Sequence, residues 1–276
     1  MNMKIVQLTN KTAYQTMGYV LQSKTGELLV IDGGIAGNDA ELYRVIKKLG
    51  GNICLWLITH PHNDHYDAVI DLLANYKDVS YEKMGAAVLP DAWADDINEE
   101  ERKELHNWNA FAKTLDDKLF EIKEGMQFSL GDMKVEVLAG NNPDLKMNPI
   151  NNQSCVFKVS EDNFSILFLG DLGAEGGNRL LSKPCDLKCT AVQMAHHGQG
   201  GVTEEVYKAI KPRFAFWPTP DWLWENRKYL GGGNIGDGPF ETPKTAEWMK
   251  SLGVHNIFSF DHTIVFDTTT MTATEF

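Results

Sequence analysis

The most constraining feature of this 276-residue chain is a group of histidine and aspartate residues that directly follows an apolar run. Residues 53–58 (ICLWLI) are uniformly apolar, which is typical of a strand that is covered on both faces. The chain then brings three imidazoles and a carboxylate close together, at His60, His62, Asp64 and His65. Imidazole and carboxylate groups suit zinc and also accept iron or manganese. The sequence therefore predicts that this strand ends at a transition-metal site.

The surrounding patterns predict that the cluster lies between a strand and a helix. Apolar residues recur at helical spacing over 66–76, directly after the cluster. Upstream, residues 18–21 and 27–32 flank turn-forming residues and predict a β-hairpin that ends at an Asp-Gly-Gly sequence. A further amphipathic helix is expected over 42–49. The chain thus enters the cluster from a strand and leaves it as a helix.

Later segments add more strands and helices. A charged helix with one apolar stripe is expected over about 97–119, and further helices near 203–210 and 243–252. Strands are predicted at 134–138, 154–159, 165–169, 190–194, 213–217, 256–260 and 263–266. Two strand-rich halves that each carry helices predict two sheets packed face to face with helices outside. We expect residues 1–276 to form one domain.

Composition excludes several classes of protein. A formal net charge of -12 disfavours binding through many phosphate contacts, so nucleic acid is an unfavourable partner and a small molecule the expected one. No apolar stretch approaches the roughly 20 residues of a membrane span, and the first residues do not resemble a secretory signal. The four cysteines fit a reducing compartment better than a disulfide framework. A cytoplasmic protein is therefore expected.

One long segment, residues 218–242, lacks a helical or strand period. It is rich in glycine and carries the aromatic residues Trp222, Trp224 and Tyr229. Long loops in compact domains are usually functional, and aromatic side chains argue against simple disorder. We expect this loop to form a wall or lid of the site, with Trp222 and Trp224 next to the substrate.

Two later motifs complete a pattern that resembles a known superfamily. Residues 168–171 (FLGD) place Asp171 after an apolar run, and residues 194–198 (MAHHG) carry a histidine pair. Alone, Gly-Asp after a strand is usually a turn. Together with His-x-His-x-Asp-His and the earlier Asp-Gly-Gly, these motifs fall in the order typical of the metallo-β-lactamase superfamily. The resemblance implies an α+β fold, a four-layer αββα sandwich with one or two metal ions at the edge of two mixed β-sheets.

The resemblance also implies a ligand set. His60 and His62 would hold one metal, while Asp64, His65 and a late histidine would hold the second, with Asp171 bridging the two. His196 and His197 are neighbours, and on an extended strand they would face opposite sides. Register with the superfamily favours His196 as the ligand. His197 is then expected to orient a ligand or to lie near the substrate.

Within the superfamily, the sequence is most similar to the hydrolase domain of the competence DNA-uptake protein family, over about residues 1–217. The similarity includes Asn151 and Asn152, which stand where many superfamily members place another histidine. These amides are expected beside a weaker first metal site. Residues 241–243 (ETP) replace a Gly-His-Pro of the competence family, which argues against a nuclease.

These observations predict a metal-dependent hydrolase that uses metal-activated water on a small ester, lactone or phosphodiester. Asp64 or Asp171 would orient that water or accept its proton. The alternatives are a nuclease or phosphodiesterase that acts on nucleic acid, and a metal-binding protein without turnover. The other histidines, His106, His255 and His262, are expected on the surface.

Overall fold

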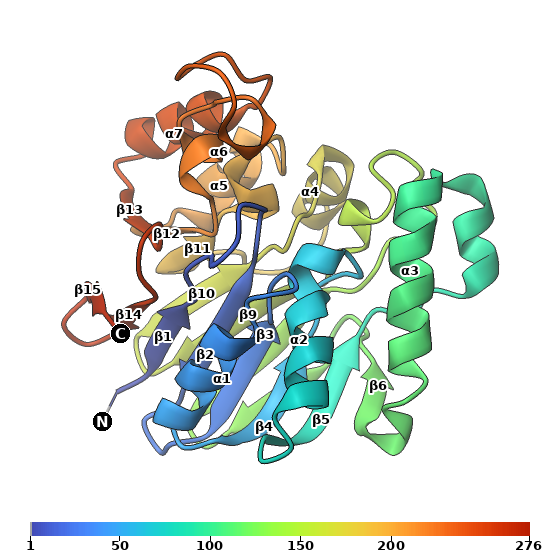
Figure 1. Cartoon of the computed structure of the whole chain (residues 1–276). Coiled ribbons are helices and arrows are strands. Elements are labelled where there is room, and N and C mark those ends of the chain that lie inside the picture. The colour runs from blue at the N-terminus through green and yellow to red at the C-terminus, as the bar shows by residue number, and fades with distance from the viewer. Residues whose placement is uncertain (1) are drawn as a thin grey trace.

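Two mixed β-sheets pack against each other at the centre of the molecule (Figure 1). The computed structural model describes residues 2–276 and, among these, every side chain except that of Asp96. The first sheet contains, in spatial order, β15 (Thr272–Glu275), β14 (Ile264–Asp267), β1 (Lys4–Gln7), β2 (Gly18–Gln22), β3 (Leu28–Asp32), β4 (Asn52–Leu57), β5 (Ser80–Ala86) and β6 (Leu119–Glu121). The second contains β13 (His255–Phe258), β12 (Phe214–Trp217), β11 (Ala191–Gln193), β10 (Phe164–Phe168), β9 (Val156–Glu161), β8 (Met133–Ala139) and β7 (Gln127–Leu130).

Each sheet has an antiparallel part and a parallel part. In the first sheet β3, β4, β5 and β6 run parallel, and in the second β10, β11, β12 and β13 do so. The inner faces of the two sheets meet in one apolar core, to which Tyr19 and Ile31 contribute from the first sheet and Phe157, Phe168 and Phe216 from the second. Neighbouring parallel strands therefore end at the same edge of each sheet.

Helices cover both outer faces. They are α1 (Asp39–Lys48), α2 (Asn63–Asn75), α3 (Glu99–Ala112), α4 (Ala174–Leu181), α5 (Glu204–Ile210), α6 (Asp221–Trp224) and α7 (Thr242–Ser251). Apolar side chains of α1, α2 and α3 pack on the first sheet, and those of α4, α5 and α7 pack on the second. Figure 1 shows α1 and α2 lying across the first sheet. The order of layers is helix, sheet, sheet, helix, which confirms the predicted αββα sandwich.

The predicted strands and helices are found with small changes of boundary, and three expectations need correction. The strand expected at 190–194 is only three residues long, and the chain turns before the histidine pair. The charged helix ends at Ala112. The segment 218–242 contains α6 and a short 3₁₀ turn at Tyr229–Gly231, so it is partly regular. Among the residues described, no helix has both the length and the apolar character needed to cross a membrane.

Candidate metal centre

Four strand ends converge where the two sheets open at one edge. From the first sheet, β3 ends at Asp32 and β4 leads into α2, whose first turn carries Asp64 and His65. From the second sheet, β10 leads to Asp171 and β11 leads to His197. Because these strands are parallel within each sheet, their carboxyl ends share an edge, and both sheets contribute side chains to one site.

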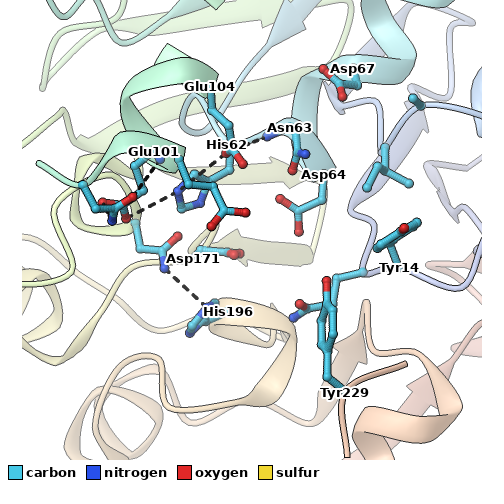
Figure 2. A pocket seen from close by; sticks show the side chains of 16 residues that line it. Tyr14, His62, Asn63, Asp64, Asp67, Glu101, Glu104, Asp171, His196 and Tyr229 are labelled. Carbon is cyan, nitrogen blue, oxygen red and sulfur yellow. Dashed lines mark hydrogen bonds and ion pairs between the residues drawn. The ribbon is translucent and has the colours of Figure 1, made fainter. Parts of the chain in front are cut away.

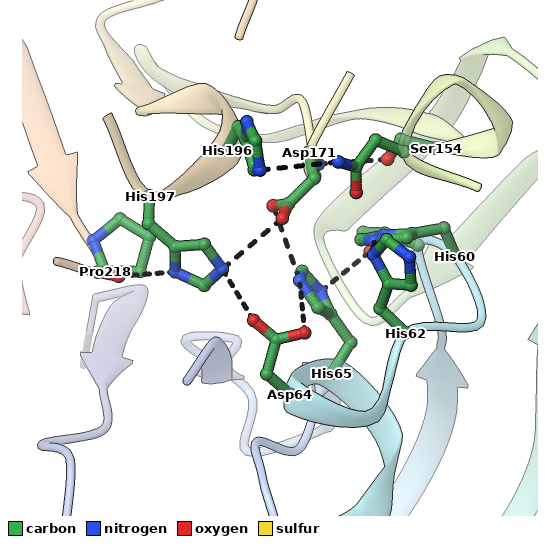
Figure 3. A network of polar contacts seen from close by, with 12 residues as sticks. His60, His62, Asp64, His65, Ser154, Asp171, His196, His197 and Pro218 are labelled. Carbon is green, nitrogen blue, oxygen red and sulfur yellow. Dashed lines mark hydrogen bonds and ion pairs between the residues drawn. The ribbon is translucent and has the colours of Figure 1, made fainter. Parts of the chain in front are cut away.

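Asp64, His65, Asp171 and His197 form a compact group, called here the Asp/His cluster. One ligand atom from each lies within 4.8 Å of the others. His197 Nε2 is 2.9 Å from Asp64 Oδ2 and 3.4 Å from Asp171 Oδ2, while His65 Nε2 is 3.4 Å from Asp171 Oδ1 (Figure 3). Three of the four side chains are buried, and Asp64 is partly exposed. The cluster brings together Asp64, His65 and Asp171, which were expected at the second metal site. Its fourth member is His197, where His196 was expected.

Each imidazole of the cluster is oriented through its other ring nitrogen. His65 Nδ1 lies 2.8 Å from Asp32 Oδ2, and Asp32 Oδ1 also accepts a hydrogen bond of 2.7 Å from the Thr59 backbone N–H. His197 Nδ1 donates to the carbonyl oxygen of Pro218 at 2.7 Å, which requires the proton to be on Nδ1. Both histidines therefore present Nε2 to the cluster, and such supporting hydrogen bonds are typical of metal ligands.

Three atoms that face the cluster are buried without a hydrogen-bond partner. They are His65 Nε2, His197 Nε2 and Asp171 Oδ1. The approach of His197 to Asp64 is within ion-pair distance but does not have hydrogen-bond geometry. Buried polar atoms are rarely left unpaired, because each costs about 1–3 kcal/mol in lost hydration. Two imidazole nitrogens and carboxylate oxygens of this kind fit the ligand set of a divalent transition metal.

The charges of the cluster are strongly coupled. Burial lowers the pKa of His65, but Asp171, Asp32 and Asp64 outweigh it and raise the pKa well above its ordinary value. Burial also opposes the charge on His197, yet Asp171 and Asp64 raise its pKa to about 10. Burial raises the pKa of Asp171, whereas His197 and His65 together hold it well below its ordinary range. The carboxylates are therefore stabilised by positive charge at this point, which imidazolium or a metal ion can provide.

His60 and His62 lie together beside the cluster. His60 Nε2 is 3.1 Å from His62 Nδ1, and His60 Nδ1 is 3.1 Å from the Thr59 hydroxyl. Two nitrogens bound to one tetrahedral ion at about 2.1 Å would be separated by about 3.4 Å, which is close to this distance. Burial, followed by His65, holds the pKa of His60 well below its ordinary value. His60 is therefore a neutral imidazole, the form that binds metals.

The structure places His197 in the cluster, where the sequence favoured His196. His196 was favoured on the expectation of an extended strand, but Ala195–Gly198 form a tight turn, called here the histidine turn. His196, His197 and Gly198 have φ values of 51°, 52° and 82°. This turn directs His197 to the cluster, whereas His196 lines a neighbouring pocket, with Nε2 at 3.3 Å from Asn151 Nδ2.

The two asparagines have different surroundings. Asn151 lines the pocket and donates to Asn148 Oδ1 at 2.9 Å, as well as contacting His196. Asn152 is fully buried, and its Oδ1 accepts hydrogen bonds of 3.1 Å from the backbone N–H groups of Gly173 and Gly176. Asn152 therefore holds the start of α4 and does not line the pocket.

The pocket next to the cluster has a volume of about 670 Å³ (Figure 2). Neither Trp222 nor Trp224 lines it. Trp222 is 5% exposed and packs against Tyr229 and Phe240, and Trp224 packs against Trp217. Tyr229 is the residue of the 218–242 segment that reaches the pocket. The segment therefore borders the site, as expected, but through a different aromatic residue.

Other contributors to the site were not identified from the sequence. Asp32 was recognised only as the end of a strand, and its place in the Asp-Gly-Gly motif was the available signal. Glu101 and Glu104 of α3 approach His62 Nε2 at 3.8 Å and 4.0 Å. In the sequence of a charged helix, glutamates that face a site look the same as glutamates that face solvent. His106, His255 and His262 are exposed, as predicted.

Sequence comparison supports a single family. The sequence model of the metallo-beta-lactamase superfamily matches residues 12–254. ComE operon protein 3 of Bacillus subtilis (strain 168) is 24% identical over 160 residues, which make up 58% of this chain. The match takes in only 19% of the length of that relative.

Solved structures agree on the fold. The metallo-beta-lactamase fold protein YhfI from Bacillus subtilis superposes with a TM-score of 0.61 at 11% identity, covering 97% of this chain and 100% of that chain. CmlA, a diiron beta-hydroxylase from Streptomyces venezuelae, gives a TM-score of 0.54 at 12% identity, over 93% of this chain and 52% of that chain. The layered fold, the order of the motifs and the family match agree, and the chain belongs to the metallo-β-lactamase superfamily.

Proposed function

We propose that this protein is a metal-dependent hydrolase of small esters or lactones. The observation that carries the proposal is the set of buried, unpartnered ligand atoms on His65, His197 and Asp171. With Asp64 they would hold one divalent ion, zinc being the best match to the ligands and iron or manganese acceptable. A bound ion would acidify water and polarise the carbonyl oxygen of the substrate.

We propose a second, weaker ion at His60 and His62. The short separation of His60 Nε2 and His62 Nδ1 supports it. Asn151, a neutral amide, stands where many superfamily members have a histidine, so this site has one imidazole ligand fewer. Occupancy of the two sites should therefore be unequal, with the Asp/His cluster filled first.

The chain's own groups would perform the proton transfers. Asp64 and Asp171 both line the pocket, so either carboxylate can accept a hydrogen bond from the attacking water and take its proton. Asp171 is held ionised by His197 and His65, which lower its pKa, and this keeps it an acceptor. Hydrogen bonds from the two imidazoles to the Asp32 carboxylate and the Pro218 carbonyl keep both rings in place during the reaction.

A nuclease is the main alternative, because the sequence resembles the competence DNA-uptake protein family. The pocket argues against it, because no lysine or arginine is among the described residues that line it. Phosphodiester substrates depend on cationic side chains or metals to balance their charge. A protein that binds metal without turnover is the other alternative.

A substrate panel with the metal-loaded protein would test the proposal. Zinc-, manganese- and iron-loaded protein should be compared on an aryl ester, a lactone, an aryl phosphodiester, a chromogenic lactam and single-stranded DNA. We expect turnover of the ester or lactone that disappears with a chelator and falls by about 10²-fold or more in Asp171→Asn. The matched control, Asp237→Asn, alters an exposed aspartate outside the pocket and should be unchanged. Fully loaded protein that hydrolyses none of the panel, or only DNA, would contradict the proposal.

A further inference from the structure

The pocket beside the Asp/His cluster is lined mainly by acidic side chains, and His62 and His196 are the basic groups of its described lining. Its volume of about 670 Å³ falls within the range of about 300–1,000 Å³ that holds small molecules. Its described lining contains six carboxylates and neither lysine nor arginine. The carboxylates belong to Asp64, Asp67, Glu100, Glu101, Glu104 and Asp171.

Four of these carboxylates lie outside the Asp/His cluster. Asp64 and Asp171 face the histidines of the cluster, which balance their charge. In the described part of the chain, Asp67, Glu100, Glu101 and Glu104 form no ion pair with lysine or arginine. Glu101 accepts a 2.6 Å hydrogen bond from Asn98 Nδ2, and His62 Nε2 lies within ion-pair distance of both Glu101 and Glu104. Since one histidine faces several carboxylates, the wall keeps an excess of negative charge that repels anions and attracts cations, and the net charge of -12 acts in the same direction.

Aromatic rings lie on the other side of the pocket. Figure 2 shows Tyr14 and Tyr229 away from Glu101 and Glu104, with Asp64 between the two walls. The two tyrosines are 47% and 57% exposed, so their rings are free to contact a ligand. A cation over the face of an exposed tyrosine ring is attracted by the ring, which strengthens binding by about two- to fivefold.

A buried acceptor atom provides an independent indication of a ligand. Asn151 lines the pocket, is 5% exposed, and its Oδ1 has no hydrogen-bond partner. Its Nδ2 donates to Asn148 Oδ1 at 2.9 Å, which leaves Oδ1 as the unpaired atom of the amide. A hydrogen-bond donor on a bound molecule would therefore satisfy this unpaired oxygen.

We propose that the pocket selects small esters or lactones that carry an organic ammonium group, bound between the α3 glutamates and the two tyrosine rings. The proposal rests on the hydrolase function proposed above and specifies its substrate class. Glu100, Glu101 and Glu104 supply the charge, and Tyr14 and Tyr229 supply the rings. Neutral substrates of the same shape bind more weakly, and anionic ones are excluded.

A matched pair of probes separates charge from shape. Choline and neohexanol have the same skeleton, but neohexanol has carbon in place of the cationic nitrogen. We expect zinc-loaded protein to bind choline at least about tenfold more tightly than neohexanol in calorimetric or ligand-observed NMR titrations. Choline binding should weaken as salt is added, because the carboxylates are partly exposed.

Variants identify the groups responsible. Glu100→Gln/Glu101→Gln should weaken choline binding by about five- to tenfold and leave neohexanol binding unchanged. Tyr229→Ala should weaken choline binding by about two- to fivefold, whereas Tyr229→Phe keeps the ring and should keep the choline affinity. Glu99→Gln is the matched control, since Glu99 lies on the same helix, pairs with Lys103 and does not line the pocket. Zinc content is measured in each variant.

The outcomes distinguish this proposal from the proposed function. If zinc-loaded protein binds choline and neohexanol equally, or if Glu100→Gln/Glu101→Gln retains wild-type choline affinity with its zinc intact, the cation preference is wrong while the hydrolase remains. If the protein binds no metal but prefers choline through these glutamates, the hydrolase is wrong and the charge preference of the pocket stands.

Discussion

At the scale of single residues, the candidate metal centre depends on atoms that orient the ligands. The ligand types were predictable, because histidines and aspartates at strand ends are chemically distinctive. Their supports were not, since Asp32 is 33 positions before His65 and the Pro218 carbonyl is 21 positions after His197. Only the packed sheets bring such groups together.

Asp32→Asn tests the importance of this orientation. An amide can still hydrogen-bond to His65 Nδ1, but it lacks the charge that makes the imidazole a stronger ligand. We expect zinc affinity to fall by about 10- to 100-fold, measured by competition with a chromophoric chelator. Asp39→Asn, which alters a partly exposed aspartate at the start of α1, is the control. Unchanged affinity in a folded Asp32→Asn protein would show that the hydrogen bond is only structural.

The two neighbouring histidines provide a second residue-scale test. His197→Ala removes a ligand atom of the Asp/His cluster and should abolish tight binding of the first zinc equivalent. His196→Ala should leave that binding within about threefold, because His196 faces Asn151 in the pocket. Isothermal titration of both variants measures this directly. If His196→Ala lost more zinc affinity than His197→Ala, His196 would be the ligand, as the sequence favoured.

At the scale of elements, the long, periodic strands and helices were predictable, and the short or irregular ones were not. Strand β5 (Ser80–Ala86) was missed because its first four residues are not buried and show no alternation. The histidine turn was missed because two consecutive non-glycine residues rarely adopt positive φ. Tertiary contacts hold it: Ala195 N–H donates to the Tyr207 hydroxyl, and the Thr219 hydroxyl donates to the His197 carbonyl.

The glycine that completes this turn is a sensitive position. Gly198 has a φ of 82°, and an added Cβ would lie 2.3 Å from the Trp217 ring. Gly198→Ala should therefore lower the free energy of unfolding by about 2–4 kcal/mol, as measured by urea denaturation. Gly236→Ala is a matched control, with a φ of 86° but no atom within 4 Å of the added Cβ, and should cost about 1 kcal/mol. Equal losses in the two variants would mean that contact with Trp217 does not constrain the turn.

At the scale of the whole molecule, the Asp/His cluster joins the two sheets. Asp64 and His65 follow β4 of the first sheet, while Asp171 and His197 follow β10 and β11 of the second. The order of the motifs along the chain made this layered arrangement predictable. The acidic pocket was not predictable, because it depends on how α3 packs beside α2 and on where Tyr14 and Tyr229 reach the same opening.

A metal ion that connects both sheets should stabilise the folded chain. A ligand that binds only the native state adds about 2.7 kcal/mol to the free energy of unfolding at a concentration of about 100 times its Kd. We expect Tm to rise on adding zinc and to fall with a chelator. The double variant His65→Ala/His197→Ala should show no such response. A zinc-induced rise in the double variant equal to that of the wild type would place the stabilising ion elsewhere.

Metal binding by the Asp/His cluster can be observed by anomalous diffraction from zinc-soaked crystals at the zinc absorption edge. We expect an anomalous peak about 2.0–2.1 Å from Nε2 of both His65 and His197, in contact with Asp64 and Asp171. A map with no peak at these four side chains, or with zinc bound only at other sites, would show that the cluster is not the metal site.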